Sequence, residues 1–280
     1  MQPWFFFTLL SVLAMACAEL SQKVALTQKA TISAITNNFF VWTLQGIGGL
    51  LIAGILGQFA FTLTSVQLIK LLIVALIYFL GGTLFYTSYK GNSPSISIVL
   101  GSVSVIVSTT LGIVFFHEGT SLEKFIGIAL VLFAIVVANI RKNEKFNKFN
   151  LLALLGGICF GIAYTLDKSF ALQLPPGIYV ALLCFSVAIV SVALRGKHII
   201  KESKPLKLHN FYPMFASATF GTLFNFFTFK SYGLGGNVGV VDAMNNTNVF
   251  LVVLMEMVLL KDRTNLRQKI VAAGLVGAGI

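Results

Sequence analysis

The four residues Gly82-Thr83-Leu84-Phe85 return in the same order as Gly221-Thr222-Leu223-Phe224, 139 positions later. A second pair of segments, 118–122 and 262–266, aligns 144 positions apart, with Thr at the third position and Leu at the fifth position of both. Apolar segments match easily by chance, but matches in one order at a nearly constant spacing are typical of an internal duplication. We therefore expect the chain to consist of two related halves.

The composition predicts that these halves lie in a membrane. Hydrophobic residues make up 57% of the 280 residues and charged residues only 10%, and the mean hydropathy is +0.90. Soluble domains carry about 25% charged residues, because much of their surface faces water. Collagen-like, disordered and disulfide-scaffold classes are excluded, since glycine shows no three-residue period and there are three cysteines. The composition indicates an all-α integral membrane protein.

Ten apolar stretches, separated by short polar or Pro/Gly breaks, are candidate transmembrane helices, because a membrane-spanning helix needs about 20 apolar residues. They are Trp4–Leu20, Ile35–Leu56, Leu68–Tyr89, Ile96–Phe116, Phe125–Ile140, Leu151–Leu172, Ile178–Leu194, Phe211–Tyr232, Val238–Leu260 and Leu266–Ile280.

The two ends of the chain leave alternatives open. Ala14-Met15-Ala16 imitates the cleavage site of a secretory signal, but no Lys or Arg precedes Trp4, which favours an uncleaved helix. The stretch Leu266–Ile280 corresponds to about 22 Å of helix, which is short for a span. We therefore expect the tenth helix to be truncated.

Each half holds five predicted helices, an odd number, so the second half must lie upside down relative to the first. The first repeat is expected over residues 4–141 and the second over residues 149–280. Secondary transporters use such inverted repeats to place a binding site near the middle of the bilayer, at the interface of the repeats. The sequence thus predicts ten transmembrane helices in two inverted five-helix repeats.

Two segments carry a resemblance to a known family. Phe115–Leu122 leads into Ile126–Leu130, and Leu259–Leu266 leads into Ala272–Leu275, so each half ends in a short acidic turn before a span rich in small residues. This pattern resembles the EamA-like family of the drug/metabolite transporter superfamily. The resemblance implies a ten-helix metabolite carrier with a central cavity lined mainly by the first, third, fourth, sixth, eighth and ninth helices. Asp262 stands where that family usually has Glu.

Basic residues indicate the orientation in the membrane. Loops on one side, including those around Lys90, 141–148 and 195–207, carry most of the 20 Lys and Arg, against 9 acidic residues in the chain. Such loops favour the cytoplasm, so both termini are expected outside, whereas the resemblance implies both termini inside. We expect a multi-pass protein of the cell membrane whose partners are lipid and a small-molecule metabolite. Nucleic acid is excluded, because the basic residues are spread over separate loops.

Polar side chains inside the ninth stretch form the first candidate site. Asp242, Asn245 and Asn246 fall within an arc of about 100° on one helix face. Amide side chains offer donors and acceptors, which suits binding of a polar solute. The alternative is that these amides hydrogen-bond between helices and hold the bundle together.

Other candidates for binding lie in the first, third and eighth stretches. Glu19 and Lys23 are four residues apart, in the favourable order for a helical ion pair, and Tyr86 and Asn225 lie deep within their spans at corresponding places of the two halves. Lys23 has two interpretations, since it either lines the cavity or extends to the membrane interface. Tyr86 and Asn225 likewise either line the cavity or pack between helices.

No motif for catalysis, metal binding or a cofactor is present in the sequence. Glu256 is a candidate proton-coupling carboxylate, with an ion pair or a position at the membrane interface as alternatives. We therefore predict a secondary transporter for a small polar or amphipathic metabolite that works by alternating access, and not an enzyme. A non-transporting scaffold, a lipid-handling protein and an intramembrane enzyme are the alternatives. Coupling to protons or a counter-solute and assembly as a homodimer stay open.

Overall fold

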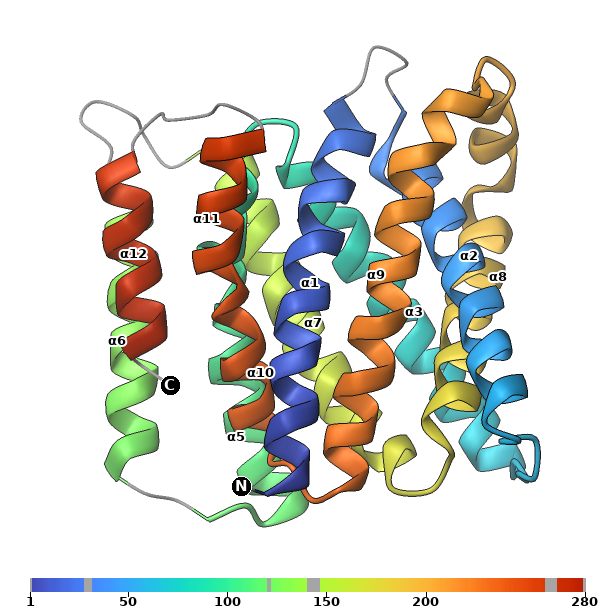
Figure 1. The fold of residues 1–280 in the computed structure, drawn as a ribbon, viewed down its shortest axis with the longest axis horizontal. Coiled ribbons are helices and arrows are strands. Elements are labelled where there is room, and N and C mark those ends of the chain that lie inside the picture. The colour runs from blue at the N-terminus through green and yellow to red at the C-terminus, as the bar shows by residue number, and fades with distance from the viewer. Residues whose placement is uncertain (1, 28–31, 120–121, 140–146, 260–265, 279–280) are drawn as a thin grey trace.

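A computed structural model describes residues 2–27, 32–119, 122–139, 147–259 and 266–278, and every regular element in these ranges is an α-helix. The helices are shown in Figure 1. Their bounds are α1 Pro3–Thr27, α2 Ala34–Ile55, α3 Ser65–Ser88, α4 Pro94–Gly101, α5 Val103–Phe116, α6 Leu122–Asn139, α7 Lys148–Ala171, α8 Pro176–Ser203, α9 Leu208–Gly233, α10 Val238–Asn246, α11 Asn248–Leu259 and α12 Leu266–Ala278. The predicted turn at Asp262 and the repeat boundaries at Arg141 and Ile280 lie outside the described residues.

Two of the predicted spans are each divided into two helices. The fourth is split into α4 and α5 at Ser102, and the ninth into α10 and α11 at Thr247. The two breaks face each other, because the Ser102 hydroxyl donates to Asn246 Oδ1 over 3.1 Å. Interrupted helices of this kind expose backbone and side-chain polar groups within the membrane and are typical of transporter binding sites.

Seven spans among the described residues are long and apolar enough to cross a membrane: α1, α2, α3, α4 with α5, α7, α8, and α10 with α11. The remaining helices, α6, α9 and α12, are not among these seven. For α12 the reason is length, since it has 13 residues, and α9 carries polar residues such as Asn210 and Asn225 within its length. The structure confirms the all-helical class and seven of the predicted spans, and the count of ten stays a prediction.

The contacts between helices form a pattern that stays the same when each helix is replaced by its counterpart in the other half. The most extensive contacts join α1 to α9, α2 to α8 and α3 to α7. By their order in the two halves, α1 corresponds to α7, α2 to α8 and α3 to α9. The α1–α9 contact therefore corresponds to the α7–α3 contact, and the α2–α8 contact corresponds to itself. In Figure 1, α1 and α9 lie side by side, and α6 lies beside α12 at one edge of the bundle.

Small residues allow α7 to approach the divided helix α4–α5 closely, as their spacing predicts. A Cβ atom on Gly157 would lie 2.4 Å from the carbonyl oxygen of Gly101, and one on Gly161 would lie 2.7 Å from that of Ser104. Because the obstructing atoms belong to backbone, a side chain at either position would have to push the helices apart.

The substitution Gly157→Ala is therefore expected to destabilise the protein by about 1–3 kcal/mol, the usual range for overpacking a close contact. Thermal unfolding of the purified protein in detergent measures the loss. Gly54→Ala is the matched control, because the nearest atom to a Cβ at Gly54 in α2 is 4.0 Å away. An equal stability for the two variants would contradict the close packing of α7.

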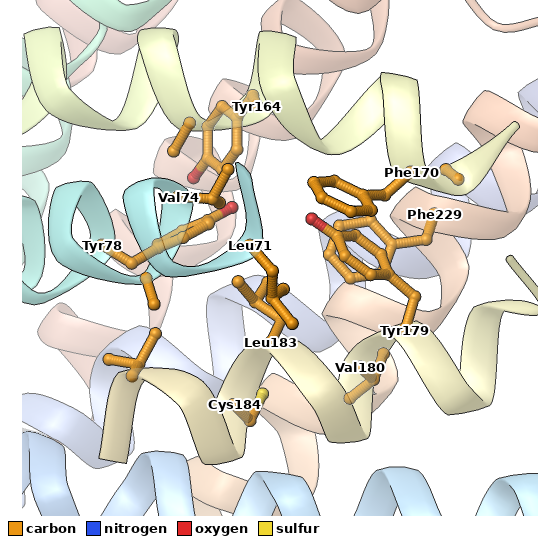
Figure 2. Close-up of a cluster of buried hydrophobic side chains, with 14 of the residues drawn as sticks. Leu71, Val74, Tyr78, Tyr164, Phe170, Tyr179, Val180, Leu183, Cys184 and Phe229 are labelled. Atoms are coloured by element: carbon orange, nitrogen blue, oxygen red, sulfur yellow. The ribbon is translucent and has the colours of Figure 1, made fainter. Parts of the chain in front are cut away.

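A buried cluster joins the two halves near α3, α7, α8 and α9 (Figure 2). The ring of Tyr179 lies 5.0 Å from that of Phe170 and 4.6 Å from that of Phe229. The hydroxyl groups of Tyr179 and Tyr78 both donate to the carboxylate of Asp167, the former over 2.5 Å. The core therefore contains a buried carboxylate whose donors are two neutral phenols.

Three connecting segments meet at the end of the bundle opposite the N-terminus (Figure 1). Ser33, before α2, donates its backbone N–H to Glu202 at the end of α8 over 3.0 Å. Lys90, after α3, donates to the carbonyl of Ile32 over 2.9 Å. Segments that carry predicted basic loops thus share one face of the molecule. Which side of the membrane this face occupies stays a prediction.

Candidate functional site

A cavity inside the bundle takes side chains from both halves. Its described lining comes from α1, α2, α3, α4 and α5 in the first half and from α7, α9 and α10 in the second. The resemblance implies most of these helices, and the structure adds α2. The polar lining residues are Glu19, Gln22, Asn38, Gln45, Tyr78, Tyr86, Ser104, Tyr164, Ser217, Asn225 and Asn246.

The cavity is narrow in this structure. Its volume for the centres of water-sized molecules is about 70 Å³, and one water needs roughly 10–15 Å³ by this measure. A few waters fit, whereas a metabolite requires the surrounding helices to move apart.

Four of the seven predicted site residues line this cavity: Glu19, Tyr86, Asn225 and Asn246. The amide of Asn225 donates to Gln45 Oε1 over 3.0 Å, which joins α9 to α2 across the cavity wall. Asn246 donates to Asp242 Oδ1 over 2.9 Å and accepts from Ser102. These amides therefore hold the wall in shape and present polar groups to the cavity.

Asp242, Asn245 and Lys23 do not belong to the cavity lining. Asn245 accepts from Ser11 over 2.5 Å and donates to Thr228 over 3.3 Å, so it links α10 to α1 and α9. Asn245 thus lies outside the cavity lining of this structure, and its contacts agree with the alternative of an amide that joins helices. The reason is rotation, since Asn245 lies at the opposite edge of the polar arc from Asn246.

Asp242 lies behind the lining rather than in it. Its carboxylate accepts from Ser104 over 3.2 Å and from Ser108 over 2.7 Å, in addition to Asn246. Because Ser104 and Asn246 line the cavity, Asp242 orients two lining side chains through its hydrogen bonds without lining the cavity itself.

Glu19 and Lys23 point to different partners. Glu19 accepts from the hydroxyls of Tyr86, over 3.5 Å, and Tyr89. The Lys23 ammonium donates to the backbone carbonyls of Tyr89 and, over 3.0 Å, Asn92, at the end of α3. Lys23 therefore supports the turn between α3 and α4 and lies outside the cavity lining of this structure.

The sequence reasoning missed the contribution of α2. Asn38, Trp42 and Gln45 line the cavity from one face of this helix, and their spacing of four and three residues is the signal that was available. Gln22 donates to Asn38 Oδ1 over 2.9 Å, which joins α1 to α2 beside the cavity.

At one end of the bundle, a buried carboxylate meets the start of α10. Glu118, just after α5, accepts from the backbone N–H of Val238 over 2.8 Å and from the Lys168 ammonium over 2.9 Å. We call Glu118, Lys168 and Val238 the Glu118 cluster. A carboxylate is stabilised there by the partial positive charge of the helix N-terminus.

At the other end, Glu256 of α11 makes the corresponding contacts with the start of α4. It accepts from the backbone N–H and hydroxyl of Ser95, each over 2.7 Å, and from Lys269 over 2.8 Å. We call Glu256, Lys269 and Ser95 the Glu256 cluster. In Figure 1, α11 ends near the top and α5 near the bottom, so the clusters lie at opposite ends of the bundle. Of the alternatives for Glu256, the structure shows the ion pair.

Comparison with known proteins agrees with this architecture. A solved structure titled "Crystal structure of protein" superposes with a TM-score of 0.75, over 98% of this chain and 93% of that chain, at 14% identity. At this identity the likeness concerns the fold alone. A search of curated proteins found no match.

Residues 147–280 match the sequence profile of the EamA-like transporter family. They contain α7 to α12, which include three of the seven spans apolar enough to cross a membrane. The chain is thus a multi-pass membrane protein, and its residues 147–280 are similar to the EamA-like transporter family.

Proposed function

We propose that this protein is a secondary transporter that carries a small polar or amphipathic metabolite across the cell membrane. The observation that carries the proposal is the cavity, since both halves line it with amides, hydroxyls and aromatic rings inside an apolar bundle. Burying so many polar side chains is unfavourable unless they serve a ligand or one another. A polar, partly aromatic lining suits a solute that has both polar groups and an apolar body.

Alternating access between two inverted halves is supported by the contacts at the two ends of the bundle. The Glu118 cluster joins α5 and α7 to the start of α10, and the Glu256 cluster joins α11 and α12 to the start of α4. Each cluster couples the two halves at one end only, so breaking one and keeping the other would open a single mouth. The cavity is too narrow for a metabolite, so transport requires the two halves to move relative to each other.

The alternative of a scaffold or lipid-handling protein does not explain why polar side chains from both halves line a cavity inside the bundle. An intramembrane enzyme needs a nucleophile with a base beside it. Ser104 has the Asp242 carboxylate beside it, but that carboxylate also accepts from Ser108 and Asn246, and the described partners of Ser217 are Gln22 and a backbone carbonyl. The carrier explains the amide-rich lining more directly.

The proposal predicts solute exchange by the purified protein in liposomes, measured as counterflow of labelled amino acids, sugars, nucleosides and amines. Asn225→Leu is expected to weaken exchange of the transported solute about tenfold, because it removes a lining amide and leaves Gln45 without its donor, a loss of about 1–3 kcal/mol.

Thr219→Val is the matched control for this variant. Thr219 lies on the same helix, is exposed, and donates only to the carbonyl of Phe215 among its described contacts. Exchange should persist in the control. The proposal would be contradicted if the wild type exchanged none of these solutes, or if the Asn225→Leu variant exchanged the solute as fast as the wild type.

A further inference from the structure

The charge of the cavity lining has a single sign. Among the described residues that line the cavity, Glu19 is the only Asp, Glu, Lys, Arg or His. Its side chain is buried, with a relative exposure of 4%. Both carboxylate oxygens of Glu19 face hydroxyl groups, those of Tyr86 and Tyr89. Hydrogen bonds from neutral phenols disperse the negative charge but do not cancel it.

Two more buried carboxylates stand one residue behind the lining. Asp167 is held by Tyr78 and Tyr179, and Asp242 by Ser104, Ser108 and Asn246. Tyr78, Ser104 and Asn246 themselves line the cavity. The described part of the chain shows no ion pair for Glu19, Asp167 or Asp242.

The carboxylates at the ends of the bundle differ in this respect. Glu118 is paired with Lys168 and Glu256 with Lys269. The chain therefore pairs its buried acids with lysine at the ends of the bundle, and surrounds those near the cavity with uncharged donors only. In a medium of low dielectric, each of these three groups that is ionised makes the potential in the cavity more negative.

Aromatic faces form the second feature of the cavity. Trp42, Tyr78, Tyr86, Phe160, Tyr164 and Phe224 all contribute to its lining. The Phe160 and Tyr164 rings are stacked, with centroids 6.0 Å apart, and Trp42 meets Tyr78 edge to face at 5.3 Å. Aromatic faces attract an organic ammonium group and also contact its apolar body.

A third feature is an unused donor in the lining. Asn38 is buried and lines the cavity, its Oδ1 accepts from Gln22, and its Nδ2 has no hydrogen-bond partner. A buried donor without a partner is unfavourable, and an acceptor atom of a solute that reached it when the helices move apart would satisfy it.

We propose that the cavity selects amphipathic organic cations, with an ammonium group beside Glu19, an apolar body against the aromatic faces and an acceptor near Asn38. This inference rests on the proposed carrier function and narrows it to a substrate class. An ammonium ion that enters the bundle loses its hydration, and the Glu19 carboxylate together with the aromatic faces replaces it. An anion meets the combined repulsion of Glu19, Asp167 and Asp242.

Three probes of similar shape test the charge selectivity: 2-phenylethylammonium, 2-phenylethanol and 3-phenylpropionate. Each is added in millimolar excess to the full-length protein in detergent, and the shift of the unfolding midpoint gives an apparent affinity. The cation is expected to bind at least about tenfold more tightly than the alcohol, because removing one member of a buried charge pair has an effect of this size or larger. The anion is expected to give no shift.

Three variants assign that preference to Glu19. Glu19→Gln should bring the affinity for the cation down to that for the alcohol, and Glu19→Asp should retain a preference for the cation. Glu123→Gln is the control, because Glu123 is an exposed carboxylate on α6. The elution profile on size exclusion shows whether each variant is folded, and the Asp variant decides the question if the Gln variant is not.

The outcomes separate this inference from the carrier function. Equal or tighter binding of the anion, an undiminished preference for the cation in Glu19→Gln, or no shift with any probe would overturn the inference. Exchange of an anionic or neutral metabolite that depends on Asn225 would leave the carrier function standing without it. Binding of the cation that depends on Glu19, in a protein that exchanges no solute, would support the selectivity and remove transport.

Discussion

Replacing Glu256 with alanine is expected to lower the free energy of unfolding by about 3–5 kcal/mol, as is usual when one partner of a buried ion pair is removed. The side chains of Glu256 and Lys269 are 1% and 2% exposed, and Glu256 also accepts from the backbone and hydroxyl of Ser95. The variant leaves the Lys269 ammonium without this carboxylate and the start of α4 without its acceptor. Unfolding in detergent by heat or by added SDS measures the effect.

The double variant Glu256→Met with Lys269→Met is the control for this prediction. Apolar side chains of similar length remove both charges together, and such replacements are often neutral or stabilising. The double variant is therefore expected to be more stable than Glu256→Ala. A loss below about 1 kcal/mol for Glu256→Ala would show that the pair is not buried in the protein, because exposed pairs contribute about that much or less.

Neutralising one end cluster is expected to open the cavity toward that end. In a cysteine-free background, Ser104→Cys places a thiol in the cavity lining. Glu118→Gln should raise the labelling of this thiol by an impermeant maleimide about tenfold from the Glu118 end, and Glu256→Gln from the other end. A tenfold shift requires only about 1.4 kcal/mol of preference for the closed mouth, less than a buried ion pair can supply.

Two comparisons make this labelling experiment decisive. Intact cells and inside-out vesicles present opposite faces to the reagent, and the Glu123→Gln variant should label like the parent from both. If both cluster variants increase labelling from the same face, or neither changes it, the clusters do not close opposite mouths and alternating access loses its main support.

Much of the helical layout was predictable, because long apolar runs of about 20 residues have few other stable arrangements in a membrane. The third span, predicted as Leu68–Tyr89, forms α3 over Ser65–Ser88. The seventh, predicted to end at Leu194, continues in α8 to Ser203 through non-helical backbone angles at Arg195. Hydropathy predicts the apolar, membrane-spanning part of a helix, and it does not show whether the helix continues into the polar residues that follow.

The candidate site was only partly predictable. Depth along the helix singled out Tyr86 and Asn225, which line the cavity, whereas helical angle did not separate Asn246 from Asn245. Both amides lie in the same polar arc, and the arc faces the cavity at one edge and α1 and α9 at the other. The sequence of a helix does not by itself determine how that helix is rotated about its axis relative to its neighbours.

By itself, the sequence determined that this is a helical membrane protein with a repeated plan, because composition and hydrophobic run length depend on the chain alone. The tertiary structure decided which polar residues meet: Glu19 with two tyrosines, Gln45 with Asn225, and each end carboxylate with a lysine and a helix start. Most of these contacts join residues distant in the chain. They depend on how helices rotate and cross, and packing of the whole bundle sets those variables.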